Sequence, residues 1–410
     1  MAPTNVLQRT VDDNLADMIL IYEDIHRNPE LSMQEFKTAD KIATELERLG
    51  LKPQRFGGTG VVAVIENGDG PVVAYRADMD ALPVTEQTNL PYASTTRSML
   101  ADGSETGVMH ACGHDSHVTV GLYLTRVLLA HKDRWSGTVV MLFQPGEEVA
   151  QGARAMLDDG LWDRVVRPEA IYGQHLWPGQ AGHVYLTPGT AMAMADSFKV
   201  TIQGRQSHGS RPEDGIDPIV LGAYMITRLQ TVVAREIPGN QMAVVTVGTF
   251  HGGTKENIIP ATAEFSINVR TFEEPIRTRV LAAIKRIILA EAQASGAPEP
   301  HIEQLYGTPR CYNDPQLAEA LLKKFADEFG AERAHRMQAI TGSEDVGYFG
   351  DDIGVPYVYW FFGGYSPEKL ASETPPPVNH SPFFAPDDVA QALKTGVRAA
   401  LIAIFSHVGK

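Results

Sequence analysis

The chain is poor in cysteine, in basic side chains and in long apolar runs. Cys112 and Cys311 are its only cysteines among 410 residues, which is too few for a disulfide framework and typical of a reducing compartment. Lys and Arg number 35 against 50 Asp and Glu, giving a net charge of -15, and a field of that sign repels nucleic acid and anionic lipid. Even the apolar stretch 280–290 contains Lys285 and Arg286 and is shorter than the roughly 20 residues of a membrane span. With no signal-peptide pattern at its N-terminus, we predict a cytoplasmic protein that binds neither nucleic acid nor membranes.

The length and the apolar pattern predict two domains. A chain of 410 residues, 43% of them apolar, is longer than one hydrophobic core usually organises. Strand-like runs alternate with helix-like periodicity early in the chain, which is typical of an α/β layered domain. The predicted strands are 61–65, 72–75, 138–143 and 170–172, and the predicted helices are 14–26 and 118–129. Ser32 and Glu35 have the spacing of a capping box, which predicts a further helix that begins there and ends at Gly50.

The middle of the chain has a different pattern. From 198 to 305 the sequence predicts strand, helix, strand, strand, helix and strand, which is the ferredoxin-like order. An apolar strand at 355–362 then returns to the first pattern. We therefore predict a discontinuous, mixed-sheet α/β domain, 1–192 and 308–410, interrupted by an inserted ferredoxin-like α+β domain, 193–307.

One short segment concentrates side chains that bind metals. Residues 109–117, Met-His-Ala-Cys-Gly-His-Asp-Ser-His, contain a thiol, three imidazoles and a carboxylate. Cys112 and His114 are two positions apart, so in an extended segment their side chains point the same way and can bind one ion. Because thiolate and neutral imidazole are preferred ligands of zinc-like ions, we interpret this pair as metal ligands and His110 as a bystander.

A pair of carboxylates follows one of the predicted strands. Glu147 and Glu148 come shortly after 138–143, and ligands in α/β sheets gather at the carboxyl ends of strands. Adjacent side chains diverge, so one carboxylate can bind a metal while the other moves a proton. Taken alone, the pair is also typical of an acidic surface turn; the Cys112 segment favours the functional interpretation.

Two histidines and two aspartates are further candidates. His175 follows a predicted strand, and His380 lies late in the chain; each alone is as consistent with a structural histidine as with a ligand. Asp78 and Asp80 come at the end of another predicted strand, where they can either orient metal ligands or cap a turn.

Six motifs in a fixed order together resemble a known family. The motifs are Arg76-Ala-Asp-Met-Asp-Ala-Leu-Pro83, Met109-His-Ala-Cys-Gly-His-Asp115, Gln144-Pro-Gly-Glu-Glu148, His175-Leu-Trp-Pro178, Gly342-Ser-Glu-Asp345 and His380-Ser-Pro382. With them, the chain resembles the M20 metallopeptidase superfamily. Within it, the chain is most similar to the amidohydrolase branch of aminoacylase-like enzymes, hippurate hydrolases and plant indoleacetyl-amino-acid hydrolases.

The resemblance implies a dinuclear metal centre in the discontinuous domain. This domain is therefore expected to be the metal-binding catalytic domain. The implied ligands of two divalent ions per subunit are Cys112, His114, Glu148, His175 and His380. Cys112 is implied to bridge the ions, and Glu147 to be the general base. Zinc suits this donor set, and so do manganese, cobalt and nickel.

The resemblance also assigns residues of the inserted domain. His208, in the motif 204–212, is implied to donate a hydrogen bond to the scissile carbonyl in the site of a neighbouring subunit. Asn257 and Arg270 match positions from which relatives hold the substrate carboxylate, a task that suits an arginine fork and an amide. The inserted domain is thus expected to be a lid and dimerisation domain, in a homodimer or homotetramer.

The activity implied by the resemblance is hydrolysis of N-acyl amino acids to a carboxylate and an amino acid. The ions would activate a water and Glu147 would accept its proton. A metallo-dipeptidase or carboxypeptidase on the same fold is the main alternative, with Glu344 as the candidate to hold a substrate amine. Two further alternatives remain. In one, Cys112 is a nucleophile activated by an imidazole; in the other, the protein is a catalytically silent scaffold that binds a small molecule.

Overall fold

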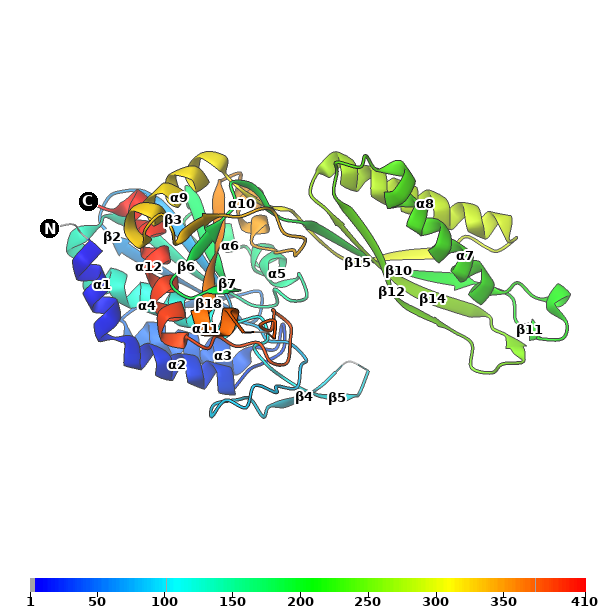
Figure 1. The fold of residues 1–410 in the computed structure, drawn as a ribbon, viewed down its shortest axis with the longest axis horizontal. Helices are drawn as coiled ribbons and strands as arrows, with labels where there is room; N and C mark the ends of the chain where they lie inside the picture. Colours follow the sequence, from blue (N-terminus) through cyan, green and yellow to red (C-terminus); the bar gives the residue numbers. More distant parts are fainter. Residues whose placement is uncertain (1–3, 101, 373) are drawn as a thin grey trace. The chain divides into compact units, whose positions relative to one another are not determined.

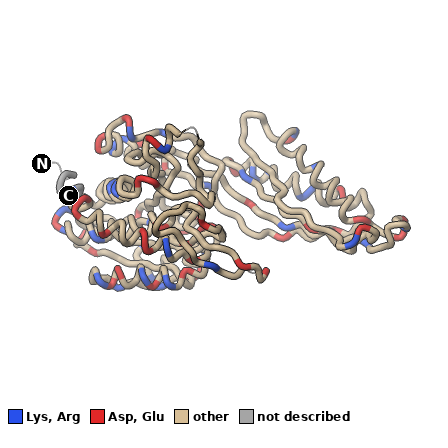
Figure 2. Tube along the Cα trace, turned by 60° about the horizontal axis from the view of Figure 1, so that its bottom comes forward, with Lys and Arg blue, Asp and Glu red and all other residues tan. Residues whose placement is uncertain are grey.

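The computed structural model describes residues 4–100, 102–372 and 374–410, and its contacts divide the chain into two compact units. The first unit comprises Met1–Ala191, Tyr312–Ala339 and Asp345–Lys410, and the second comprises Met192–Cys311 and Ile340–Glu344. The predicted insertion, 193–307, falls inside the second unit, which in addition includes the short segment 340–344. Basic and acidic side chains are interspersed along both units (Figure 2).

The first unit is built on an eight-stranded mixed sheet with strand order β1-β2-β6-β3-β7-β18-β8-β17. Up to the boundary, its elements are α1 (Thr4–Asp13), α2 (Leu15–Arg27), α3 (Phe36–Arg48), β1 (Gln54–Phe56), β2 (Gly60–Asn67), β3 (Val72–Asp78), β4 (Arg97–Met99), β5 (Glu105–Gly107), α4 (His114–Ala130), a 3-10 turn (Lys132–Arg134), β6 (Gly137–Gln144), α5 (Gly152–Asp158), α6 (Leu161–Arg164), β7 (Ala170–Gln180), β8 (Val184–Leu186) and β9 (Gly189–Met192). After the second unit they are β16 (Cys311–Asn313), which pairs with β9, then α9 (Pro315–Phe329), β17 (Ala334–Arg336), α10 (Gly347–Ile353), β18 (Tyr357–Tyr365), α11 (Pro367–Leu370) and α12 (Val389–Val408).

The central strands of this sheet are covered on both faces. β3 is parallel to both β6 and β7, and β7 is parallel to β18, whereas β2 and β8 join the sheet antiparallel. Helices α4 and α12 pack against each other and on β3 and β18, while α5 and α6 lie on the other side (Figure 1). This double cover explains the nearly continuous apolar runs of β6 and β18. The predicted mixed-sheet α/β architecture is confirmed.

Helix α12 is a long apolar helix that packs within the first unit. It is long and apolar enough to cross a membrane, but 56% of its apolar window is buried inside the protein. It packs on α4, β18 and β7. Core helices of globular units have the same length, hydropathy and burial.

One expectation about helix capping is wrong. Helix α3 starts at Phe36 rather than after Ser32, and Glu35 makes no capping hydrogen bond to it. Ser32 Oγ instead donates to Asp80 Oδ2 at 2.6 Å, and the Glu35 carboxylate accepts from the backbone of Gly146. The expected end of the helix near Gly50 is correct, since Gly50 has a left-handed φ of 82° just after Arg48.

The second unit has the predicted ferredoxin-like order. Its elements are β10 (Met194–Gln203), β11 (Ser207–His208), a 3-10 turn (Pro212–Asp214), α7 (Pro218–Thr231), a π turn (Val232–Glu236), β12 (Ala243–Gly252), β13 (Ile258–Ile259), β14 (Thr262–Thr271), α8 (Glu274–Ala294) and β15 (His301–Thr308). The four long strands form an antiparallel sheet in the order β12-β14-β10-β15. Helices α7 and α8 pack together and on β14, around a separate apolar core. The short pair β11 and β13 lies at one end of this unit (Figure 1).

Candidate metal centre and active site

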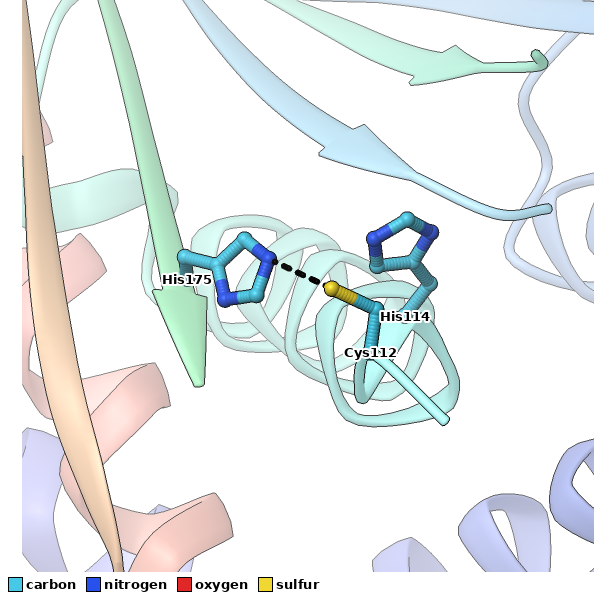
Figure 3. Close-up of side chains that lie close together, drawn as sticks. All are labelled: Cys112, His114 and His175. Carbon is cyan, nitrogen blue, oxygen red and sulfur yellow. Dashed lines mark hydrogen bonds between the residues drawn. The ribbon is translucent and has the colours of Figure 1, made fainter. Parts of the chain in front are cut away.

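Cys112 and His175 meet where helix α4 begins. Gly113, the N-cap of α4, has a left-handed φ of 88°, and a Cβ at this position would lie 2.7 Å from Leu176 Cδ2. Only glycine therefore allows this turn to pack so closely against β7. The result is that Cys112 Sγ lies 3.4 Å from His175 Nε2, and that the thiol sits between the rings of His175 and His114 (Figure 3).

Glu148 and His380 lie at the same cluster. Glu148 follows the end of β6, and its carboxylate is 3.3 Å from His380 Nε2 and 3.9 Å from His114 Nε2. His380 has a left-handed φ of 73°, and its backbone N–H donates to the Ala111 carbonyl at 2.7 Å. The structure thus brings together all five side chains that the resemblance names as ligands, from segments far apart in the chain.

The donor atoms form two overlapping groups. Cys112, His114 and His175 form one group and Cys112, Glu148 and His380 form another, and in each group the ligand atoms lie within 4.8 Å of one another. Cys112 belongs to both groups, as a bridging ligand would. His114 Nε2 and Glu148 Oε1 are buried and have no hydrogen-bond partner in the described part of the chain, which is costly unless another group binds them. One thiolate, three imidazoles and a carboxylate with such free donor atoms fit divalent cations of the zinc type.

Hydrogen bonds at the Nδ1 atoms of His114 and His175 orient these rings for metal binding. His114 Nδ1 donates to Asp80 Oδ1 at 3.2 Å, and His175 Nδ1 donates to the Leu176 carbonyl at 2.7 Å. Each bond places the proton on Nδ1 and leaves the Nε2 lone pair for a metal. Asp80 also accepts from the backbone N–H of Glu148 at 3.0 Å, so it touches two of the five candidate ligands.

Asp78 belongs to a buried ionic network beside the cluster. It accepts hydrogen bonds from Arg76 Nη1, at 2.6 Å, and from His117 Nδ1. The other nitrogen of His117 accepts from the backbone N–H of Leu176 at 2.7 Å. His117 therefore links β3 to β7, and the centre of its ring lies 5.3 Å from that of His114 and 4.6 Å from that of His175. Sequence reasoning assigned His117 no role, although it lies in the histidine-rich segment.

Asn379 is a second residue that sequence reasoning missed. Its Nδ2 donates to the carbonyls of Cys112 and Leu176, both at 3.3 Å, and lies 3.8 Å from Cys112 Sγ. It thereby fastens the segment that bears His380 to the segments that bear the other ligands. Its position directly before His380 placed it near a candidate ligand but did not reveal these contacts.

Burial shifts the pKa values of several side chains in the cluster. Burial raises the pKa of the Cys112 thiol well above its usual value, and Glu148 and Glu147 raise it further. Burial likewise raises the pKa of Glu148 to about 7, and burial lowers the pKa of His175. A raised thiol pKa is the opposite of what a nucleophilic cysteine needs, so it argues against that alternative. Divalent ions bound here would favour the deprotonated forms of the Cys112 thiol and the Glu148 carboxyl.

The candidate residues of the second unit lie in two separate regions of that unit. His208 pairs with Ile258 across the β11–β13 ladder, and Gly209 N–H donates to the Asn257 carbonyl at 2.8 Å, so His208 and Asn257 lie together. Arg270 lies near the opposite end of β14, where it faces Ala195. At about 3.3 Å per residue, the strand from Thr262 to Arg270 spans about 26 Å.

Arg270 is held by neutral partners. Its Nε donates to Asn268 Oδ1 at 2.8 Å and its Nη1 donates to Ser343 Oγ at 2.5 Å. Among the contacts given for the described residues, both partners of this half-buried guanidinium are uncharged. Its charge is therefore available to an anionic ligand.

Comparisons with known proteins agree with this geometry. The model of peptidase family M20/M25/M40 matches residues 74–401. The chain is 35% identical over 393 residues to N-acetylcysteine deacetylase of Bacillus subtilis (94% of this chain, 96% of the relative) and 34% identical over 400 residues to thermostable carboxypeptidase 2 of Saccharolobus solfataricus (95% of each). The crystal structure of the Bacillus subtilis YXEP protein, described as a dinuclear metal binding peptidase from the M20 family, is similar with a TM-score of 0.73 and 31% identity, over 96% of this chain and 98% of that one. The resemblance seen in the motifs is confirmed: the protein belongs to peptidase family M20/M25/M40, a family of metal-dependent hydrolases of amide bonds.

Proposed function

We propose that the protein hydrolyses N-acyl amino acids to a carboxylate and a free amino acid. The observation that carries the proposal is the cluster of Cys112, His114, Glu148, His175 and His380 beside a further carboxylate, Glu147. One of the similar proteins, the N-acetylcysteine deacetylase, is named for the removal of an acyl group from an amino acid, which supports this choice among amide substrates.

Glu147 is the proposed general base. Two divalent ions held by the cluster would supply Lewis acidity, which acidifies a water and polarises an amide carbonyl. The Glu147 carboxylate belongs to one group with His114 and Glu148, whose ligand atoms lie within 4.8 Å of one another, and it is only half-buried. In this position it accepts the proton of the attacking water and returns it to the leaving amine.

The substrate carboxylate is proposed to bind Arg270, with His208 and Asn257 supplied by a second copy of the chain. The long span of β14 between Arg270 and the pair His208–Asn257 supports this division, because one chain cannot place both ends of its second unit on one small substrate. We propose a homodimer for this reason.

Exposed apolar side chains of the second unit support a dimer. Val220 and Tyr224 are exposed on α7, and Val244 and Phe250 are exposed on β12, which is an edge strand of its sheet. Edge strands and apolar patches of this kind are covered in many proteins by another chain.

A carboxypeptidase or dipeptidase activity is the second candidate function. The similarity to thermostable carboxypeptidase 2 favours it, and its substrates would also present a terminal carboxylate to Arg270. The two candidates differ in the group on the other side of the scissile bond, an acyl chain in one and an amino acid in the other.

A substrate panel with metal control tests the proposal. Release of amine is measured from acetyl, benzoyl and indoleacetyl derivatives of several amino acids, and from alanyl-leucine. We expect N-acetyl-leucine to be cleaved faster than alanyl-leucine, activity to vanish after treatment with a chelator, and activity to return with a specific divalent ion. Preferential cleavage of the dipeptide would favour the second candidate, and a fully metallated protein that cleaves neither would overturn both.

A further inference from the structure

The segment Ser32–Glu35 makes contacts that its expected capping role does not explain. Glu35 is fully buried. Its Oε1 accepts hydrogen bonds from the backbone N–H groups of Met33 and Gly146, both at 2.8 Å, and its Oε2 accepts from Thr59 Oγ1 at 2.6 Å. A carboxylate from the N-terminal part of the chain thus binds the turn that carries the proposed general base.

The turn is held on both sides of Glu147. The backbone N–H of Gly146, one residue before it, donates to Glu35 at 2.8 Å, and the backbone N–H of Glu148, one residue after it, donates to Asp80 at 3.0 Å. Ser32 Oγ donates to the same Asp80 oxygen at 2.6 Å. The two anchoring carboxylates are therefore connected through one short segment of the chain.

Packing restricts the same turn. Gly146 has a left-handed φ of 55°, and a Cβ there would lie 2.4 Å from the sulfur of Met33. Met33 itself has a left-handed φ of 61°, and its N–H is fixed by Glu35. Glycine adopts its conformation at Gly146 freely, but the left-handed conformation of Met33 is unfavourable for a residue with a side chain, and the bond to Glu35 helps to maintain it.

We propose that Glu35 is a positioning residue that fixes the Gly146–Glu148 turn, and through it the direction of the Glu147 and Glu148 carboxylates. The inference rests on the proposed function for its kinetic consequence, because Glu35 touches neither a candidate ligand nor the general base. Groups that orient metal ligands and catalytic side chains from behind are worth about 10- to 100-fold in activity or metal affinity.

A neutral amide can replace this carboxylate. Burial and the nearby Asp80 raise the pKa of Glu35 to about 7, so a full negative charge is poorly tolerated there. In Glu35→Gln, the amide oxygen accepts both backbone N–H groups and the amide nitrogen faces Thr59 Oγ1, which accepts a hydrogen bond in turn. A positioning role survives this change, whereas a role in proton transfer or charge does not.

The test compares Glu35→Gln, Glu35→Ala and a control in the metal-loaded enzyme. Glu45→Ala is the control. Glu45 lies within α3 and is buried like Glu35, but its carboxylate binds Arg126 Nη2 at 2.9 Å and Arg48. We expect Glu35→Ala to lower kcat by about 10- to 100-fold with little change in KM, and Glu35→Gln to retain most of kcat. Glu45→Ala should leave kcat unchanged, even if it lowers the melting temperature.

Hydrogen–deuterium exchange of the peptide containing Gly146 gives a readout that does not depend on activity. Faster exchange at Gly146 in Glu35→Ala, but not in Glu35→Gln, supports the proposal. If the wild-type enzyme cleaves no N-acyl amino acid while this exchange pattern holds, the proposed function fails and the positioning of the turn stands. Equal loss of kcat in both Glu35 variants, or unchanged kcat or Gly146 exchange in Glu35→Ala, would overturn the proposal. Should Glu35→Ala not fold, Glu35→Asp, which is one methylene too short to reach Gly146, takes its place with the same expected outcomes.

Discussion

The candidate residues of the two units differ in how firmly the chain holds them. In the first unit, His114 and His175 are buried and each has one ring nitrogen fixed by a hydrogen bond. In the second unit, His208 and Asn257 are exposed, and the ring of His208 is bound only through Nδ1, by the hydroxyl and N–H of Ser210, among the contacts that the structure describes. The first set comes together within one chain, whereas the proposed role of the second set requires a second copy of the chain.

This difference follows from the chemistry that each set is proposed to perform. Metal ligands must be deprotonated and aligned before the ion arrives, so they benefit from burial and from partners behind them. A donor that contacts only the substrate, and does so across a subunit interface, must stay accessible until the partner is in place. Variants that disable one set at a time therefore test whether the two units differ in this way.

The largest effect is expected at Glu147. Glu147→Gln keeps the size of the side chain but removes the proton acceptor, so kcat should fall by about 10²–10⁴. The metal content, measured by elemental analysis of the purified protein, should stay at the wild-type level. Residual activity close to wild type in the metal-loaded variant would show that another group is the base and that the cluster is organised differently.

The next effect is expected at His208. His208→Ala should lower kcat by about 10²–10³, as for loss of an oxyanion donor, without a change in thermal stability because the side chain is exposed. If His208 acts across the interface, mixing equal amounts of His208→Ala and Glu147→Gln subunits should restore about a quarter of the wild-type activity, since half of the dimers then contain one intact site.

Subunit exchange and a matched histidine control complete this experiment. The two variants are unfolded and refolded together, and activity is compared with that of each variant refolded alone. His301→Ala, which alters an exposed histidine on β15 of the same unit, should have wild-type activity. If the mixture is no more active than its components, His208 acts within its own chain and the proposed contrast between the units fails.

The sequence predicted the parts of the fold that depend on burial. Strands 138–143 and 355–362 were visible because both faces of β6 and β18 are covered, which demands continuous apolar runs. The ferredoxin-like order of the second unit was visible because its elements alternate regularly. Short strands such as β8 and β17 contain three residues each and carry no periodic signal, so they were missed.

The site was predictable to the extent that its chemistry is local. Cys112 and His114 are two positions apart and could be paired from spacing, whereas His175 and His380 needed the family motifs because they arrive from distant segments. Local rules also failed where a distant partner competed, as when Ser32 and Glu35 bind Asp80 and Gly146 instead of capping a helix. The roles of His117 and Asn379 likewise depend on contacts across the fold that no local pattern encodes.

The smallest effect is expected at His26, which contacts the first turn of α4 in the first unit. This buried histidine binds Asp115 at 2.6 Å and Glu86 at 3.0 Å, and Asp115 lies in the first turn of α4 beside His114. Burial lowers the pKa of His26, but the bonds to Asp115 and Glu86 outweigh burial and raise the pKa to about 9. Because the folded protein holds this proton more tightly than the unfolded chain, the stabilisation is complete below pH 6.5 and is lost as the pH rises through about 9.

Urea unfolding of the metal-loaded protein between pH 6 and pH 10 measures this contribution. The wild-type free energy of unfolding should decline by about 3 kcal/mol more than that of His26→Gln across this interval, from the rise of the pKa alone. His131→Gln is the control for loss of a histidine, because His131 binds the neutral hydroxyl of Thr10 rather than a carboxylate. If His26→Gln and the wild type instead decline in parallel, His26 is neutral in the folded protein, and the base of α4 is held by packing and neutral hydrogen bonds rather than by a buried ion pair.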